Sequence, residues 1–538
     1  MKGRFSIGIG LATCCLRRFG FMVLLDLPPS VPHSVAHAFW ELVQHRSGSL
    51  ALWWPNQDRW CHWTWGQIAT GVAQEIHRLS ELGVRRGDRV VTAVPNSPRW
   101  ILRDIACHTM GIIHVTLDWR VPQSQLEECI ARVQPCDVVV QQDGLQEYGE
   151  DDHPELATWK ADQWAKAAQQ VDVDAPATII FTSGTTSRPK GVVLSHRNLA
   201  SNACAKLDAS PQTRQDLRLN VLPFSHAFAR TCELSTWILT GGQLALCPTW
   251  EHMVAGARAI RPTVINLVPY QARQLADLLD QEPGALGPQL RMLNVGGAAV
   301  EQDLFERLAA HGLPPVQGYG LTEASPCVCA NRYGQQLPGG VGKPVRGTVV
   351  RIDASGLLWV RGPQVMLGYW QDPDATAAVL DAGWLNTGDL ATQREDGHYV
   401  IHGRAEDRFT LSTGLQVYPG ELERVLSQDP WVEQCVVLGE GQPGISVWVW
   451  PKADQIPPQY HCPASEHALQ LDEAAVCAAL RDRWLESCAA LPHYLVPRCI
   501  RFLPQRLSTG NNLITAKGTY RRREIVAWLR RRGLTLGD

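Results

Sequence analysis

Alternating helix and strand patterns fill the first half of the chain. In segment 64–90, apolar residues recur at helical spacing, a glycine ends the pattern, and the strand-like run RVVTAV follows. These residues are Ile68, Val72, Ile76, Leu79, Leu82 and Gly83. Similar helix-then-strand units occupy residues 101–117, 126–140, 196–223 and 253–268. Because a helix is the usual connection between parallel strands, the pattern predicts an α/β fold with parallel sheets.

The pattern changes after about residue 335. Short strands alternate there with Gly/Pro turns, as in PGGVGKPVRGTVVRI and GLLWVRGPQVMLGYW, which indicates a smaller sheet or barrel. From Gly420 onward, the runs ELERVL, QCVVLGE and ISVWVWP indicate a compact α+β domain, with segment 403–420 as the linker. We therefore predict a large N-terminal domain of two α/β sheet subdomains plus a small β-barrel, followed by a smaller α+β C-terminal domain.

Composition limits the class of function. The chain has 538 residues, 45% hydrophobic and 19% charged, which suits roughly three to four domains or subdomains. Lys and Arg number 50 against 53 Asp and Glu, a formal charge of -3, so no net basic field would attract nucleic acid and we exclude nucleic-acid binding as the main function. The 16 cysteines form no C-x-x-C pair, which favours reduced thiols in the cytoplasm.

Residues 1–25 form an N-terminal extension ahead of the domains. Their basic start and short apolar runs raise the question of a signal peptide, but Arg17 and Arg18 interrupt the apolar stretch and no A-x-A cleavage site follows. No run in the extension approaches the roughly 18 apolar residues that span a membrane. A start at Met22 explains the segment equally well, and we predict a cytoplasmic protein.

The most specific segment is TIIFTSGTTSRPKGVVLSH, at residues 178–196. A β-rich run leads into a loop of small, mostly hydroxyl-bearing residues, which a lysine follows. The loop residues are Thr182, Ser183, Gly184, Thr185 and Thr186, and the lysine is Lys190. Hydroxyls, accessible backbone N–H groups and an ammonium group can converge on phosphate oxygens. Because Lys190 follows a proline and leads into another apolar run, this is a phosphate-binding loop of a kind other than the Walker loop.

With this loop the chain resembles the adenylate-forming enzymes, the AMP-binding superfamily of acyl-CoA synthetases, firefly-type luciferases and peptide-synthetase adenylation domains. The likeness extends from about residue 35 to 530. The further motifs are NVGGAA at 294–299, QGYGLTEASP at 317–326, WLNTGDL at 384–390 and GRAEDRFTLSTGLQVYPGELE at 403–423. Each alone is common loop chemistry, but together they follow the family's order. Long-chain acyl-CoA synthetases are the branch that the chain most resembles.

The resemblance implies a nucleotide site. Tyr319 would stack on adenine, and Thr322 would touch the α-phosphate of ATP. Glu323 would hold Mg²⁺, a metal that prefers oxygen ligands and substrate phosphates. Gly297 lies in the glycine turn that would line the adenine and carboxylate site.

The last motifs imply a ribose contact and the domain boundary. Asp389 would accept hydrogen bonds from the ribose hydroxyls, with Arg404 beside the same sugar. Glu406 would lie at a hinge about which the C-terminal domain rotates between two half-reactions. The implied divisions are an AMP-binding domain at 26–403, the hinge at 404–407 and a mobile C-terminal lid domain at 408–538.

The C-terminal catalytic motif departs from the family's pattern. Many relatives have a glycine, then the catalytic lysine, then an arginine shortly after. Here NNLITAKGTYRRREI at 511–525 has Thr519 after Gly518, and its lysine, Lys517, lies on the other side of the glycine. Either Lys517 reaches the α-phosphate through a shift of the loop, or the adenylation lysine is absent and the first half-reaction is crippled. We favour the first, because a glycine turn can move a long point charge.

Residues 222–231, LPFSHAFART, bear on the acid substrate. Peptide-synthetase relatives use an aspartate in this segment to hold an amino group, and its absence here disfavours an α-amino acid. The segment resembles long-chain acyl-CoA synthetases, in which His226 and Phe228 would lie between the acyl and thiol passages. An ordinary packed histidine is the alternative for His226.

The predicted function is an ATP- and Mg²⁺-dependent ligase that adenylates a carboxylic acid, a fatty acid first of all, and transfers the acyl group to coenzyme A. Within the same class, the alternatives are ligation to an acyl carrier protein or the use of an aryl acid such as o-succinylbenzoate. The displaced lysine leaves a third alternative, an acyl- or nucleotide-binding pseudoenzyme.

Six arginines cluster in the C-terminal run YRRREIVAWLRRRG, at 520–533. The usual explanation is a solvated helix face. Two sharper hypotheses are contact with the phosphates of coenzyme A, and peripheral attachment of a basic amphipathic helix to an anionic membrane.

Overall fold

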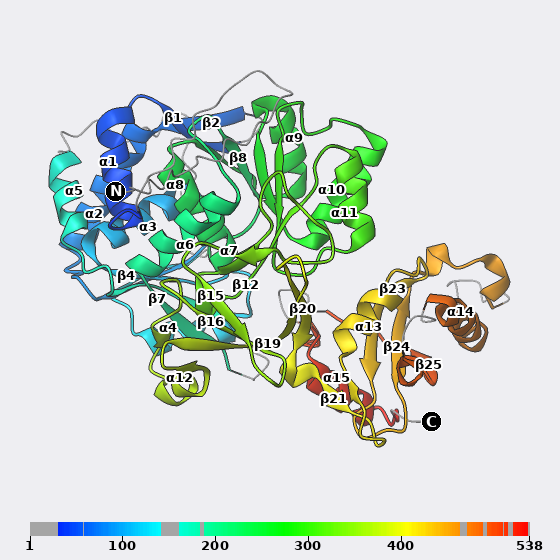
Figure 1. Cartoon of the computed structure of the whole chain (residues 1–538). Coiled ribbons are helices and arrows are strands. Elements are labelled where there is room, and N and C mark those ends of the chain that lie inside the picture. Colours follow the sequence, from blue (N-terminus) through cyan, green and yellow to red (C-terminus); the bar gives the residue numbers. More distant parts are fainter. Residues whose placement is uncertain are drawn as a thin grey trace, which may run out of the picture.

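Two domains of unequal size make up the structure, a computed structural model. It describes residues 31–56, 59–140, 161–182, 188–462, 471–487, 492–508, 510–514 and 520–535. The large N-terminal domain contains the three largest sheets, and the smaller C-terminal domain stands beside it (Figure 1). The predicted α/β fold with a large first and a smaller second domain is thereby confirmed.

The expected helix-then-strand units are all present. They are α2 (Trp65–Glu81) with β3 (Arg89–Ala93), α3 (Pro98–Met110) with β4 (Ile113–Thr116), α4 (Gln123–Val133) with β5 (Asp137–Val140), α6 (His196–Ala209) with β8 (Leu217–Asn220), and α9 (Trp250–Ile260) with β10 (Val264–Leu267). Local signals set the bounds of α2. Thr64 and Gln67 form a capping box at its start, and Gly83, with φ 76°, follows its end. Leu82, which we expected on the buried face, lies past the helix and is 55% exposed.

The first sheet has six strands in the order β17-β7-β6-β4-β3-β5. Its further members are β6 (Pro176–Thr182), β7 (Lys190–Ser195) and β17 (Gly368–Tyr369). Strands β3 to β6 pair in parallel, and β7 and β17 add an antiparallel edge. The successive residues Val90 and Val91 of β3 face different hydrophobic cores. Val90 packs in the core that includes α2 and α3, and Val91 packs in the core that includes α4. Both faces of this sheet are therefore buried, as is usual for parallel strands.

The second sheet has nine strands in the order β14-β13-β12-β11-β10-β8-β9-β1-β2. Its further strands are β1 (Leu50–Asn56), β2 (Arg59–Thr64), β9 (Gln243–Leu246), β11 (Met292–Val295), β12 (Val316–Gly320), β13 (Cys327–Ala330) and β14 (Lys343–Pro344). In this spatial order, the neighbours from β12 through β11, β10, β8 and β9 to β1 pair in parallel. The edge strands β2, β13 and β14 pair antiparallel with their neighbours. Helices α9, α10 (Pro269–Gln281) and α11 (Gln302–Ala310) share one core with β8, β10 and β11. The other helices of this domain are α1 (Val35–Arg46), α5 (Ala161–Gln169), α7 (Ala227–Ala229), the π-helical turn η2 (Arg230–Ser235) and α8 (Thr236–Thr240).

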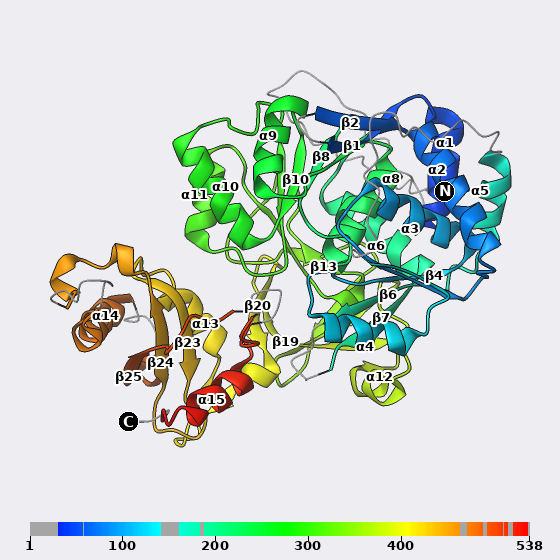
Figure 2. The ribbon, with the colours of Figure 1, turned by 180° about the vertical axis from the view of Figure 1, so that it is seen from behind.

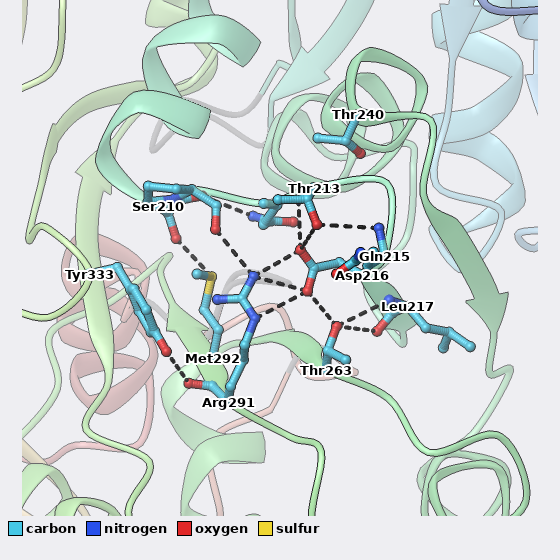
Figure 3. A network of polar contacts seen from close by, with 12 residues as sticks. Ser210, Thr213, Gln215, Asp216, Leu217, Thr240, Thr263, Arg291, Met292 and Tyr333 are labelled. Carbon is cyan, nitrogen blue, oxygen red and sulfur yellow. Dashed lines mark hydrogen bonds and ion pairs between the residues drawn. The ribbon is translucent and has the colours of Figure 1, made fainter. Parts of the chain in front are cut away.

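A polar network joins the amino ends of three parallel strands of the second sheet (Figure 3). Asp216 precedes β8, Thr263 precedes β10 and Arg291 precedes β11. Arg291 Nη2 lies 2.8 Å from Asp216 Oδ2, and the Thr263 hydroxyl donates to Asp216 Oδ1 at 2.7 Å. Burial alone would raise the pKa of Asp216, but Arg291 and the hydrogen bonds from Thr263 and Thr213 hold it below its usual range.

Asp216→Asn should lower the free energy of unfolding by about 2 kcal/mol near neutral pH, because it removes the charge of a buried carboxylate that bonds to the partly exposed Arg291. A depressed carboxyl pKa stabilises the folded state above the unfolded pKa and ceases to do so as the pH falls, so the difference from wild type should shrink below about pH 4. Urea unfolding at several pH values measures this. Glu282→Gln, which breaks an exposed ion pair with Arg258, is the control, and equal midpoints for the two variants would contradict the prediction.

The third sheet follows in sequence, where we expected a smaller sheet or barrel, and its described strand pairings form an open sheet. It has five strands, β15 (Val349–Ile352), β16 (Leu357–Arg361), β18 (Leu380–Asp381), β19 (Trp384–Gln393) and β20 (Tyr399–Arg404), and α12 (Pro373–Val379) precedes β18. Strand β20 pairs with β19 and ends at the short helix η4 (Ala405–Asp407), where the chain passes into the C-terminal domain (Figure 1).

The C-terminal domain is built on the sheet β23-β24-β25. Its elements are β21 (Phe409–Thr410), β22 (Gln416–Val417), α13 (Pro419–Leu426), β23 (Val432–Leu438), β24 (Ser446–Pro451), α14 (Glu473–Ser487), β25 (Cys499–Phe502) and α15 (Arg522–Arg531). Alternate residues of β23 face opposite cores, Cys435 and Val437 toward α13 and α14, Val436 and Leu438 toward α15. Figure 2 shows α15 in red beside these strands.

The C-terminal arginine cluster is not a uniform solvated face. Arg522 is partly buried and pairs with Glu423 at 2.5 Å, and its Nε lies 3.7 Å from Asp407. The exposed arginines are Arg523, Arg530, Arg531 and Arg532. Arg522 therefore anchors α15, and contact of the exposed arginines with coenzyme A or a membrane stays a prediction.

Two sequence expectations concern the whole chain. All the cysteines that the structure describes are free thiols, and the reduced environment stays a prediction. Within the described ranges, no helix is both long and apolar enough to cross a membrane.

Candidate active site

The expected phosphate loop connects β6 to β7. Thr182 ends β6 and pairs with Lys190, the first residue of β7, and the Thr182 hydroxyl donates to the Lys190 carbonyl at 3.4 Å. At the outgoing end of the loop, Arg188 forms an exposed ion pair with Glu128 of α4 at 2.8 Å. The other predicted loop residues, Ser183, Gly184, Thr185 and Thr186, lie outside the described residues.

Lys190 and Glu323 are linked by a tyrosine that the motifs did not single out. Tyr369 of β17 lies beside β7, with the Lys190 Nζ 4.9 Å from its ring centroid. Its hydroxyl donates to Glu323 Oε1 at 2.9 Å. Burial and the carboxylate of Glu323 raise the pKa of Tyr369, so the hydroxyl keeps its proton. The cation of the loop and the expected metal ligand therefore both contact one tyrosine, the first at its ring and the second at its hydroxyl.

A second group of polar side chains joins β12 to the third sheet. The Tyr319 hydroxyl of β12 donates to Asp389 Oδ2 at 2.5 Å. Asp389 and Arg404 are opposite residues of β19 and β20, with 3.4 Å between Asp389 Oδ1 and Arg404 Nε, and Arg404 also donates to the Thr387 carbonyl at 2.6 Å. Burial raises the pKa of both Tyr319 and Asp389.

These two groups form one electrostatic cluster. Burial alone would lower the pKa of Arg404, but the charges of Asp389 and Glu323 raise it above its usual value. Thr322 is buried next to Glu323 in the short helix η3 (Thr322–Ala324), and the Glu323 carbonyl accepts from Met366 N at 2.8 Å. The structure thus brings together most of the predicted nucleotide-site residues that it describes.

The glycine turn after β11 packs against the segment that carries His226. A Cβ added at Gly296 would lie 3.2 Å from Cζ of Phe228, so a side chain at this position would require the ring to shift by a few tenths of an ångström. Gly297 follows with φ 90°, a conformation that favours glycine. The Phe228 ring and this turn therefore share one side of the site.

His226 has a charged partner that sequence reasoning missed. Its Nε2 lies 3.2 Å from Oδ2 of Asp118, which in turn pairs with Arg120 at 2.7 Å. The one available signal was the position of Asp118 just after β4, because polar residues at the carboxyl ends of parallel strands commonly face a ligand site.

Glu323 is the predicted metal ligand. Across the described part of the chain, no group of three His, Cys, Asp or Glu side chains could hold a metal ion by itself. Mg²⁺ commonly takes one or two carboxylates and completes its shell with substrate phosphates and water. A single carboxylate beside Lys190 and Tyr369 therefore fits Mg²⁺ that binds together with a nucleotide.

Two further predicted residues belong to the hinge and to the C-terminal motif, and the charge of the first, Glu406, acts on Asp389 and Arg404. Glu406 is in η4, two residues past Arg404, at the passage into the C-terminal domain. Lys517 lies outside the described residues, and its role stays a prediction.

Two protein families match the chain, one in the large N-terminal domain and one in the C-terminal domain. The AMP-binding enzyme family matches residues 39–370, and the AMP-binding enzyme C-terminal domain matches residues 406–468. The first match alone covers more than half of the chain, including the phosphate loop, the glycine turn, Glu323 and Tyr369.

Relatives with known names agree with these matches. A feruloyl-CoA synthase of Amycolatopsis sp is 30% identical over 479 residues, 86% of this chain and 94% of the relative. A long-chain fatty acid CoA ligase of Yersinia pestis is 38% identical over 289 residues, 49% of this chain and 50% of the relative. The solved o-succinylbenzoate coenzyme A synthetase of Bacillus subtilis, in complex with ATP and magnesium ion, has a TM-score of 0.72 at 22% identity, covering 91% of this chain and 99% of its own. The chain therefore belongs to the AMP-binding enzyme family of the adenylate-forming superfamily.

Proposed function

We propose that the protein is an AMP-forming acid–thiol ligase that acts on an apolar carboxylic acid, with a fatty acid as the first candidate, and on coenzyme A. The observation that carries the proposal is the joined cluster of Lys190, Tyr369, Glu323, Arg404 and Asp389. It sets cations, hydroxyls and one carboxylate suited to Mg²⁺ beside the end of a phosphate-type loop.

The first half-reaction requires charge neutralisation more than proton transfer. A carboxylic acid has an ordinary pKa of about 4 to 5, so it is already an anion near neutral pH and can attack the α-phosphate of ATP without a general base. Lys190 and the hydroxyl of Thr182 would contact the phosphates, and Glu323 would hold Mg²⁺, which neutralises phosphate charge when bound. Asp389 and Arg404 would fix the ribose.

The second half-reaction transfers the acyl group from the adenylate to a thiol and releases AMP. We infer that the C-terminal domain moves about residues 404–407, so that one site serves both steps. The structure offers the chain path for such a motion, since η4 is the connection between β20 and the C-terminal sheets.

The segment around His226 supports an apolar acid. Residues 222–231 contain no aspartate to bind an α-amino group, and Phe228 places an aromatic ring on the glycine turn. The 38% identity to a long-chain fatty acid CoA ligase favours a fatty acid. The match along 86% of the chain to a feruloyl-CoA synthase favours an aryl acid as the second candidate.

A panel of acids distinguishes the two candidates. AMP release would be measured with ATP, Mg²⁺ and coenzyme A, for straight-chain fatty acids of increasing length and for ferulic, anthranilic and o-succinylbenzoic acids. A kcat/KM that rises with chain length and exceeds that of every aryl acid supports the fatty acid proposal, and the reverse order rejects it. The same assay with acyl carrier protein in place of coenzyme A tests the carrier-protein alternative.

Gly296→Ala should reduce kcat/KM for the preferred acid severalfold, because the added methyl group would lie 3.2 Å from the Phe228 ring and push it by a few tenths of an ångström at the proposed acid site. Adding Phe228→Leu should restore part of the loss, since the smaller side chain leaves room for the methyl group. Gly48→Ala is the control, as a Cβ there meets nothing within 4 Å. Unchanged kinetics for every acid would show that this contact lies away from the acid.

A further inference from the structure

Asp118 and His226 connect the two main sheets at their carboxyl ends. Asp118 lies two residues past β4 of the six-stranded sheet, and His226 follows β8 of the nine-stranded sheet, just before α7. Their closest atoms, Oδ2 and Nε2, are 3.2 Å apart. Ligands of open parallel α/β sheets bind in the region outside the carboxyl ends of the strands, so this pair lies where a substrate is expected.

The carboxylate of the pair is held in its charged form. Arg120 donates from Nε at 2.8 Å and from Nη2 at 2.7 Å to the two oxygens of Asp118. Burial alone would raise the pKa of Asp118, but the hydrogen bonds from Arg120 and His226 hold it well below its usual range. An ionised, nearly buried carboxylate therefore faces one nitrogen of His226, and Arg120 is the other charge beside it.

Part of the His226 side chain stays open to solvent. The His226 side chain is 33% exposed, whereas that of Asp118 is 9% exposed. Two residues further on, Phe228 packs on Gly296 of the glycine turn. The exposed part of the imidazole thus lies close along the chain to the ring that we assign to the acid site.

The loop that carries His226 is fixed from the opposite sheet. Asn96, just after β3, donates to the Leu222 carbonyl at 2.8 Å and accepts from Phe224 N at 2.9 Å. The same Asn96 amide donates to Asn220 at the end of β8 at 2.7 Å. Since both Asn96 and Asp118 follow strands of the first sheet, contacts from that side hold both the loop and the imidazole of His226.

We propose that His226, oriented by Asp118, accepts the proton of the attacking thiol in the second half-reaction. The inference rests on the proposed acid–thiol ligase function. A thiol has an ordinary pKa of about 8.5 and is mostly protonated near neutral pH, so this step, unlike the first, has a proton to remove.

The step balances without a further reagent. The S–H bond breaks and its proton moves to the free imidazole nitrogen, while sulfur forms a bond to the acyl carbon. The bond from that carbon to the phosphate oxygen then breaks, and AMP leaves with the electron pair. Asp118 stabilises the imidazolium that results and is a positioning residue, because it acts through His226. The imidazolium later returns the proton to solvent.

Separating the half-reactions tests the pair. The acyl-adenylate would first be formed on the enzyme from acid, ATP and Mg²⁺ with pyrophosphatase, and then mixed rapidly with coenzyme A. His226→Gln should slow thioester formation in this single turnover by about 10²-fold. This loss should exceed any loss in ATP–pyrophosphate exchange by at least about tenfold, because the first half-reaction needs no base.

Two further measurements separate a proton acceptor from a structural histidine. Added free imidazole should restore the rate of His226→Ala. Asp118→Asn should slow the same step by about tenfold or more, while Asp280→Asn, which alters a similar pair with His311 on the surface, should not.

The outcomes keep this inference distinct from the proposed function. No acid-dependent exchange in the wild type would reject the ligase function itself. Exchange together with equal losses in both half-reactions for His226→Gln, or the absence of rescue by imidazole, would reject the proton acceptor and leave the ligase function standing.

Discussion

Asp389→Asn should weaken ATP and AMP binding by roughly 10²-fold, about 3 kcal/mol. Hydrogen bonds to a charged acceptor contribute about 1.5 to 3 kcal/mol each, and the carboxylate is expected to accept from the ribose hydroxyls. The same change weakens the contact with Arg404, which Asp389 faces at 3.4 Å, and with Tyr319. The KM for ATP in acid-dependent ATP–pyrophosphate exchange and the Kd of AMP measure the effect.

Asp353→Asn is the matched control for Asp389→Asn. Asp353 lies between β15 and β16 and accepts hydrogen bonds from Trp359 Nε1 at 2.9 Å and the Ser355 hydroxyl at 2.6 Å, so it tests the loss of an engaged carboxylate in the same sheet. An unchanged Kd of AMP in folded Asp389→Asn protein would place the nucleotide elsewhere.

Lys517→Ala should lower the rate of ATP–pyrophosphate exchange by about 10²-fold or more. Lys517 is the lysine of segment 511–525, and a cation at the α-phosphate is expected to neutralise charge as pyrophosphate leaves. Thioester formation from a supplied acyl-adenylate should be much less affected, because that step forms no pyrophosphate.

Lys452→Ala, at an exposed lysine of the same domain, controls for loss of positive charge. If Lys517→Ala exchanges pyrophosphate as fast as this control, the displaced lysine has no part in adenylation. Another cation of the site, with Lys190 as the first candidate, would then neutralise the phosphate charge during adenylation.

Local structure was predictable where the signals are local. The spacing of Ile68, Val72 and Ile76 fixes a buried helix face, and the residues of the capping box lie three apart. Helix-then-strand units therefore followed from the sequence. The order of the strands did not, because pairs such as Leu52 with Leu244 join segments far apart in the chain.

In the site, too, local motifs were predictable and long-range contacts were not. The motifs indicated Glu323, Asp389 and Tyr319 one by one, but no local pattern shows that Tyr319 bonds to Asp389 or that Tyr369 bonds to Glu323. Those contacts join residues of three different sheets, so they depend on how the sheets pack against one another.

The arginine cluster shows that a run of charges in the sequence does not reveal which of its side chains is buried. In the run YRRREI, Arg522 differs in no local feature from its neighbours, yet it is the one that pairs with Glu423. Glu423 lies 99 residues before Arg522 in the chain. Only the packing of α15 against β23 therefore identifies Arg522 as the buried arginine.

Acid-dependent exchange of pyrophosphate into ATP, in the absence of any thiol, tests the central claim most directly. The protein, with Mg²⁺, would be offered the panel of fatty and aryl acids one at a time, with AMP binding measured in parallel. The account predicts exchange with at least one apolar acid and none without an acid. Measurable nucleotide binding without exchange for any acid would contradict it and identify a binding protein in place of a ligase.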